Sequence, residues 1–326
     1  MKSFIVFDLE WNQSPEGKFG TNEKLPFEII EIGAVKLSES FEFVSEFHEL
    51  VKPKIYRRMH YKITEVTHMA MSKLKRDGKE FPAVLKSFLR WCGDDPMFCT
   101  WGPMDLTQLQ KNMTYYGIPF PYRVPLFYYD VQKLYAIQRG DEKNKPSLDR
   151  AIDELELTED RPFHRALDDA YYTGKVFCAL NYSMVKPYLS LDCYQIPASE
   201  ETEIYLKFPT YTKYVSHGYP SKEEAMENKR VREIKCPDCG RALRKKIQWF
   251  ASGQKYFYAI GICKEHGLVR GKIRIKKAED QSTYVVKTIK LSSDSEFERI
   301  KLKRDEVRKR RSKRAKNHLL KQQGEN

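Results

Sequence analysis

The N-terminal stretch Phe4-Ile5-Val6-Phe7-Asp8-Leu9-Glu10-Trp11 decides how the first half of the chain folds. The apolar run before Asp8 predicts a buried β-strand. Residues two apart in a strand point to the same face of the sheet, so Asp8 and Glu10 project together. Two neighbouring carboxylates repel each other, and a divalent cation is the usual reason to tolerate such a pair. An exposed strand end would also explain the pair, but the apolar flanks favour a metal site.

The segments that follow this strand predict an α/β domain. Two further strands precede an alternation of helices and strands, which indicates a sheet that mixes antiparallel and parallel strands and carries helices on its faces. The predicted strands span residues 3–9, 29–37, 42–51, 97–101 and 126–131, and the predicted helices span residues 81–92, 106–116, 147–155 and 166–180.

Two later segments add acidic residues and a histidine. Asp105 stands after the strand at 97–101, at the start of a predicted helix, where an N-cap role would explain it equally well. His164 precedes a helix whose first turn contains Asp168 and Asp169, where capping and interaction with the helix dipole are the alternative roles. None of these residues identifies a function by itself.

Together these motifs resemble the DnaQ-like (DEDDh) family of 3′-to-5′ exonucleases, and within it the branch of the three-prime histone-mRNA exonuclease. The resemblance runs from about Phe4 to Leu180, a little over half of the chain. It is carried by the segments FDLEW, FEIIEIGAVKL, LVKP, YKITEVTHMA, FPAVLKSFL, WGPMDLTQL, SLDRAIDELEL and HRALDDA.

The resemblance implies a ribonuclease H-like fold and a set of site residues. The acids that match the family's metal ligands are Asp8, Glu10, Asp105 and Asp169, and His164 matches its general base. The spacing from the histidine selects Asp169 over its neighbour Asp168. Carboxylate oxygens favour two Mg²⁺ or Mn²⁺ ions, and a histidine whose pKa is near neutrality can accept a proton from the attacking water.

The C-terminal half contains a second group of metal-binding residue types. Cys236 and Cys239 form a C-x₂-C pair, and Cys263 and His266 form a C-x₂-H pair about two dozen residues later. This spacing is typical of one structural Zn²⁺ in a closed site with three cysteines and one histidine. The alternative is a set of scattered reduced cysteines and a surface histidine. Both pairs are followed by glycine, which favours tight metal-binding turns.

The excess of positive over negative charge lies entirely in the second half of the chain. Residues 1–184 hold 25 Lys and Arg against 27 Asp and Glu, whereas residues 185–326 hold 33 against 18. Taken with the motifs above, this predicts an exonuclease domain at 1–184, a linker with local structure at 185–234, a zinc-ribbon-like β module at 235–291 and a basic tail at 292–326. The tail shows no apolar stripe wide enough to be buried. Tyrosines in the linker could pack internally or stack on bases.

These features predict a metal-dependent 3′-to-5′ exonuclease, with RNA favoured over DNA as the single-stranded partner. The alternatives are a non-catalytic nucleic-acid-binding regulator on an exonuclease scaffold and a zinc-ribbon factor that leaves the first half without a role. The tail could instead dock to a ribosome or another protein. The N-terminus lacks a secretory signal, no apolar run is long enough to cross a bilayer, and the seven cysteines suit a reducing compartment, so we expect a cytoplasmic protein without a membrane partner.

Overall fold

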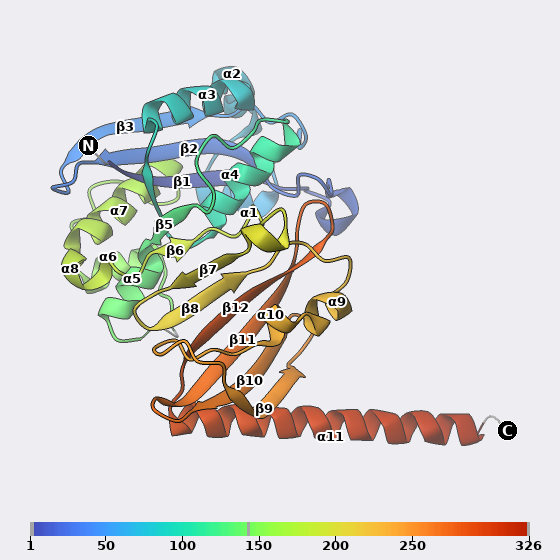
Figure 1. Ribbon diagram of the computed structural model, residues 1–326. Helices are drawn as coiled ribbons and strands as arrows, with labels where there is room; N and C mark the ends of the chain where they lie inside the picture. The colour runs from blue at the N-terminus through green and yellow to red at the C-terminus, as the bar shows by residue number, and fades with distance from the viewer. Residues whose placement is uncertain (1–2, 142–143, 325–326) are drawn as a thin grey trace. The chain divides into compact units, whose positions relative to one another are not determined.

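The computed structural model describes residues 3–141 and 144–324, with side chains described as far as Lys313. The chain divides into two compact units, Met1–Tyr194 and Gln195–Asn326 (Figure 1). Each unit is built on its own six-stranded sheet. In the described part of the chain, no helix combines the length and the apolar character needed to span a membrane.

The first unit has a mixed ribonuclease H-like sheet in the order β3-β2-β1-β4-β5-β6. The first three strands form an antiparallel meander, β4 and β5 run parallel to β1, and β6 is antiparallel to β5. The strands are β1 (Phe4–Asn12), β2 (Glu28–Leu37), β3 (Phe43–Leu50), β4 (Met97–Thr100), β5 (Phe127–Asp130) and β6 (Ser190–Leu191). The α/β fold class and the mixed sheet expected from the sequence are confirmed.

The helices of this unit cover the two faces of the sheet. The helices are α1 (Tyr61–Thr67), α2 (Met71–Asp77), α3 (Phe81–Cys92), α4 (Met104–Tyr115), α5 (Val131–Gln138), α6 (Leu148–Glu154), α7 (Ala166–Ala179) and α8 (Tyr182–Val185), with a 3₁₀ turn at Gly17–Gly20. Helices α3 and α4 pack on the face that contains Ile5 and Phe7. Helices α5, α6 and α7 pack on the face that contains Phe4 and Val6.

The alternation along β1 therefore decides where its two acids point. Phe4 and Val6 face α7, and by the period of two Asp8 and Glu10 continue on that same face. Strand β2 comes very close to α7 at Gly33, where an added Cβ would overlap the main chain of Ala166 and Leu167. This close approach brings the start of α7 against the sheet, beside the two acids.

The second unit is an antiparallel sheet in the order β7-β8-β12-β11-β10-β9. Its strands are β7 (Ile204–Lys207), β8 (Tyr211–Val215), β9 (Arg244–Ala251), β10 (Tyr256–Cys263), β11 (Gly267–Lys277) and β12 (Thr283–Leu291). Its helices are α9 (Lys222–Glu227), α10 (Lys229–Arg232) and α11 (Asp294–Gly324), with a 3₁₀ turn at Glu200–Thr202. Helices α9 and α10 cover one face, with Ala225 and Val231 packed against Ile273 and Val285.

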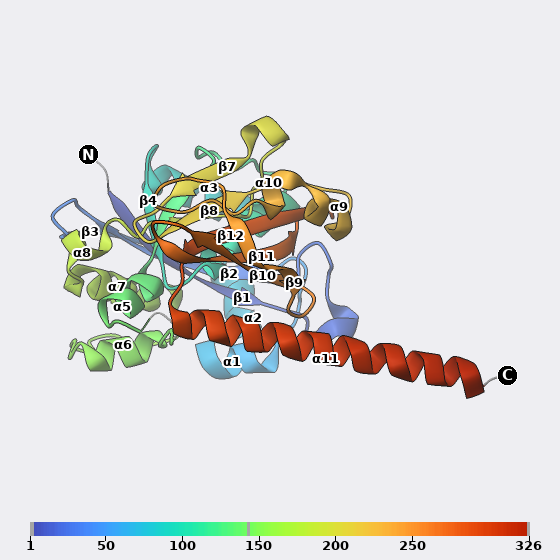
Figure 2. The same cartoon turned by 60° about the horizontal axis from the view of Figure 1, so that its bottom comes forward.

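Two expectations for this half need correction. The segment expected as a linker with local structure at 185–234 contributes β7 and β8 to the sheet, and in β8 the alternate residues Thr212 and Tyr214 are buried. The tail expected to lack a buried stripe begins as a packed helix, because Phe297 and Ile300 contact the cluster formed by Ile247 and Ile260. Beyond these contacts α11 extends past the sheet, as both views show (Figures 1 and 2).

Candidate active site

Three of the predicted acids converge where β1 meets the N-terminal end of α7. Each of Asp8, Glu10 and Asp169 offers a carboxylate oxygen, and these oxygens lie within 4.8 Å of one another, which is close enough to hold a metal ion. Asp8 and Glu10 come from neighbouring positions on one face of β1, and Asp169 lies in the first turn of α7. The structure thus brings together residues that are about 160 positions apart in the chain.

The fourth acid, Asp105, lies in the first turn of α4 and is only 4% exposed. Its Oδ1 accepts a hydrogen bond from the main-chain N–H of Leu9 at 3.3 Å, which fixes it beside the strand between Asp8 and Glu10. Its oxygens lie outside the 4.8 Å group formed by the other three acids. Asp105 is nevertheless near enough to raise the pKa of both β1 carboxyls.

Burial and mutual repulsion make these carboxyls reluctant to ionise. Burial raises the pKa of Asp8 well above its usual range, and Asp105 and Glu10 raise it further. Burial together with nearby carboxylates raises the pKa of Glu10 to about 8, that of Asp105 to about 7 and that of Asp169 to about 6. A divalent cation would compensate this excess of negative charge, so the donor set fits the oxygen-ligated Mg²⁺ or Mn²⁺ expected from the sequence.

His164 lies directly before α7, in a left-handed backbone conformation with φ 67°. Its main-chain N–H donates to Oδ1 of Asp169 at 3.2 Å, and its imidazole is exposed to solvent. The neighbouring Asp168 has a different environment, with its carboxylate 3.9 Å from the Arg161 guanidinium. Of the two aspartates, therefore, it is Asp169 that joins the β1 acids and contacts His164.

An ion-pair network that was not predicted from the sequence borders this site. Glu31 on β2 has a fully buried carboxylate that accepts hydrogen bonds from Arg165 Nη2 at 2.6 Å and from His48 Nε2 at 2.6 Å. Burial alone would raise the pKa of Glu31, but the hydrogen bonds from His48 and Arg165 outweigh it and the net pKa is lowered. Because Arg165 follows His164, this network anchors the turn that carries the histidine. The sequence feature that could have revealed this network is the charged Glu31 inside the apolar run from Ile29 to Ala34.

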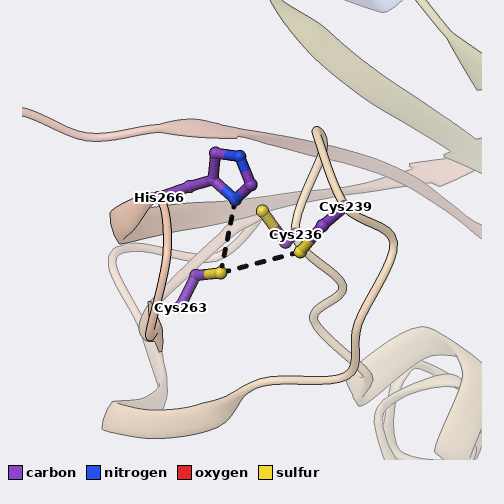
Figure 3. Close-up of side chains that lie close together, drawn as sticks. All are labelled: Cys236, Cys239, Cys263 and His266. Carbon is purple, nitrogen blue, oxygen red and sulfur yellow. Dashed lines mark hydrogen bonds between the residues drawn. The ribbon is translucent and has the colours of Figure 1, made fainter.

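The predicted cysteine and histidine group also comes together, within the second unit. Figure 3 shows Cys236 and Cys239 facing Cys263 and His266 across a small gap. The Sγ atoms of Cys239 and Cys263 are 3.7 Å apart, and Cys263 Sγ lies 3.6 Å from His266 Nδ1. Four donors on a tetrahedron with zinc–sulfur distances of about 2.3 Å would be spaced by about 3.8 Å, so the group fits a zinc ion.

Comparison with known proteins concerns the first unit of the chain. The family model described as RNase_T, Exonuclease, matches residues 5–177, which is more than half of the chain. The chain belongs to this DEDDh exonuclease family. The matched range spans the positions of the four acids and of His164, and it ends before the second unit begins at Gln195.

Two known proteins are similar to this same part of the chain. The Probable 3'-5' exonuclease KapD of Bacillus subtilis (strain 168) is 31% identical over 182 residues, which cover 54% of this chain and 82% of that protein. The nuclease domain of 3'hExo, a DEDDh family member whose crystal structure contains bound rAMP, has 20% identity and a TM-score of 0.50, over 59% of this chain and 96% of that one. The latter similarity establishes the shared fold.

Proposed function

We propose that this exonuclease removes nucleotides from the 3′ end of single-stranded RNA by a two-metal mechanism in which His164 is the general base. The observation that supports the proposal most strongly is the convergence of Asp8, Glu10 and Asp169 within 4.8 Å, with Asp105 alongside. The complete acidic set argues against the non-catalytic regulator. The preference for RNA follows the sequence resemblance to the histone-mRNA exonuclease branch.

The proposed roles follow from the chemistry of each side chain. Asp8, Glu10, Asp105 and Asp169 hold the cations and position the scissile phosphate next to β1. The cations, when bound, would activate a water and stabilise the leaving 3′ oxygen. His164 accepts the proton of the attacking water, and its exposed imidazole can release that proton to solvent. The Glu31–Arg165 pair holds the turn that presents His164.

The second unit supplies affinity in this proposal. The first 184 residues have an excess of acids and repel a long polyanion, whereas the cationic second half attracts it. A structural zinc bound by Cys236, Cys239, Cys263 and His266 would keep this module folded. The first unit then carries out the chemistry on a strand that the second unit retains.

The experiment that tests the proposal is digestion of RNA and DNA oligonucleotides of the same sequence, labelled at the 5′ end, with Mn²⁺, Mg²⁺ or no added cation. We expect a ladder that shortens from the 3′ end, faster on RNA and dependent on the cation. His164→Ala should slow it by about 10² or more, because a general base acts in the transition state. An oligonucleotide whose 3′ end is blocked should resist degradation. Release of labelled mononucleotide from the 5′ end, or activity without cations, would refute the proposal.

A further inference from the structure

A row of cationic side chains occupies one face of the second sheet, opposite the face covered by α9 and α10. Along β11 the odd-numbered residues, such as Ile273 and Ile275, are buried under these helices. The even-numbered residues point the other way, and four in succession are cations: Arg270, Lys272, Arg274 and Lys276. Alternate residues of a strand are spaced by about 7 Å, so this row extends for roughly 20 Å.

Aromatic rings from the neighbouring strand lie between these cations. In the β10–β11 register Tyr256 is opposite Arg274, and Tyr258 is opposite Lys272. The Lys272 ammonium lies 4.9 Å from the centre of the Tyr256 ring, and the Arg274 guanidinium lies 5.9 Å from it. From α11, the Lys303 ammonium lies 4.8 Å from the Tyr258 ring. Cations beside partly exposed rings are typical of surfaces that bind phosphates and stack bases.

The positive charge of this surface is only partly neutralised within the protein. Arg270 and Arg299 both pair with Glu296. Among the described residues, Lys272, Arg274 and Lys303 form no ion pair with a carboxylate. Burial lowers the pKa of Lys272, and the neighbouring cations Arg270, Arg274, Lys303 and Arg299 lower it further. A bound anion would relieve this repulsion.

The row ends at a hollow that is also cationic. Its volume is about 630 Å³, and among the described residues that line it Glu223 is the one acid. The basic residues in its lining are Lys222, Lys255, Arg274, Lys276 and Lys277. The surface thus continues from the row of alternating cations and rings into a concave site that can take a further phosphate.

We propose that this surface, defined as the β10–β11 face with Lys303, binds the single-stranded RNA substrate, with phosphates on Lys272, Arg274 and Lys276 and a base stacked on Tyr256. The identity of the ligand rests on the proposed function. The inference adds that the substrate-binding surface lies on the sheet of the second unit. It differs from attraction by the basic tail, because ring stacking and ordered phosphate contacts require the folded sheet. An acidic protein partner is the competing occupant.

The test compares K272Q/R274Q with the matched control K229Q/R232Q, which removes the same charge from α10 on the covered face. Binding of fluorescent oligo(U) is measured by anisotropy over a range of salt concentrations, with Asp8→Asn in every protein to prevent cleavage. We expect K272Q/R274Q to raise Kd about tenfold and to flatten the log–log salt slope by about 1.4, because two phosphate contacts are lost. The control should change Kd by less than about twofold.

Ring substitutions separate stacking from charge. Tyr256→Ala should weaken oligo(U) binding at least about fivefold, because the ring that stacks on a base is lost, whereas Tyr256→Phe should retain binding, because it keeps the ring. An unchanged zinc content and an unchanged melting temperature in each variant would show that the variant is correctly folded. If K272Q/R274Q binds oligo(U) like its control, the inference is overturned. The proposed function is tested separately by hydrolysis of a dinucleotide by the wild-type protein with Mn²⁺. If the wild-type protein does not hydrolyse the dinucleotide, the proposed function is refuted rather than this inference.

Discussion

At the scale of single residues, the carboxylate of Glu31 joins two cationic side chains beside the candidate active site. It is fully buried and receives hydrogen bonds from Arg165 and His48. We predict that Glu31→Gln lowers the free energy of unfolding by about 2 kcal/mol, because Arg165 then lacks a buried counter-charge. It should also lower kcat more than it raises KM, since the His164 turn loses its anchor.

A matched substitution on the surface provides the control for this prediction. Glu46 pairs with Arg161 at 2.7 Å, but its side chain is 42% exposed. Glu46→Gln should change the free energy of unfolding by less than about 1 kcal/mol. Chemical denaturation of both variants measures the difference, and equal destabilisation would contradict the role assigned to Glu31.

The raised pKa values of the acids predict how stability depends on pH and cations. Unfolded Asp and Glu ionise near pH 4, whereas the folded protein keeps protons on Glu10 to about pH 8 and on Asp169 to about pH 6. The folded state binds more protons in this window, so without added cations stability falls as pH rises. Mn²⁺ should therefore raise the melting temperature more near pH 8 than near pH 5.

Thermal melting with and without Mn²⁺ at both pH values checks this prediction. Asp8→Asn removes one negative charge and one ligand, so it should reduce the Mn²⁺-induced rise at both pH values and make the metal-free protein less sensitive to pH. A Mn²⁺ effect that is the same at both pH values would mean that the acids do not compete with protons for the cation.

At the scale of elements, the contact between β2 and α7 controls the position of Asp169. A Cβ at Gly33 would overlap main-chain atoms of Ala166 and Leu167, which cannot rotate away as a side chain can. We predict that Gly33→Ala pushes α7 outward, destabilises the fold by roughly 1–3 kcal/mol and weakens Mn²⁺ binding. Denaturation and Mn²⁺ titration give the two readouts.

Gly174 offers a control at the same interface. A Cβ there would lie 3.2 Å from side-chain atoms of Val35 and Phe43, which can adjust, and alanine is the better helix former. Gly174→Ala should leave the affinity for Mn²⁺ unchanged. Loss of Mn²⁺ binding in both variants would show that general packing, rather than the Gly33 contact, sets the position of α7.

Elements with a clear apolar period were predictable from the sequence, and those without one were not. The meander, α3 and α7 all have buried faces that recur in the sequence. Helix α5 was missed because it follows β5 directly, and only the N-cap of Asp130, whose side chain accepts from the Lys133 N–H, marks the change. Strand β7 was not predicted because none of its residues is fully buried, and β8 was not predicted because its buried residues include Thr212 and Tyr214, which look polar in a sequence.

The site was predictable for a similar reason. The spacing of Asp8 and Glu10 places both on one face of a strand without any tertiary information. The environment of Glu31 depends on Arg165, which lies 134 positions away, and no local pattern reveals such a pair. The resemblance to a known family selected Asp169 over Asp168, and the separate environments of these two residues are a property of the folded chain.

At the scale of the whole molecule, the second unit should depend on zinc. We predict about one zinc per chain, because the four donors of the Cys/His cluster fit one closed tetrahedral site. Cys263→Ser should lose the zinc and lower the melting temperature of this unit, whereas Cys193→Ser should do neither. Elemental analysis and calorimetry measure both effects, and a zinc-free wild-type protein with unchanged melting would contradict the prediction.

In the proposed mechanism, the acids that the fold brings together at β1 and α7 hold the cations that catalyse hydrolysis. The most direct measurement is the single-turnover rate of 3′-end cleavage with saturating Mn²⁺ for Asp169→Asn and Asp168→Asn, which make the same change at adjacent positions. We predict that Asp169→Asn lowers the rate by at least about 10², because a metal ligand is lost, and that Asp168→Asn changes it by less than about threefold. If Asp168→Asn lowers the cleavage rate and Asp169→Asn does not, or if neither variant lowers it, then Asp169 is not a ligand of the catalytic cations.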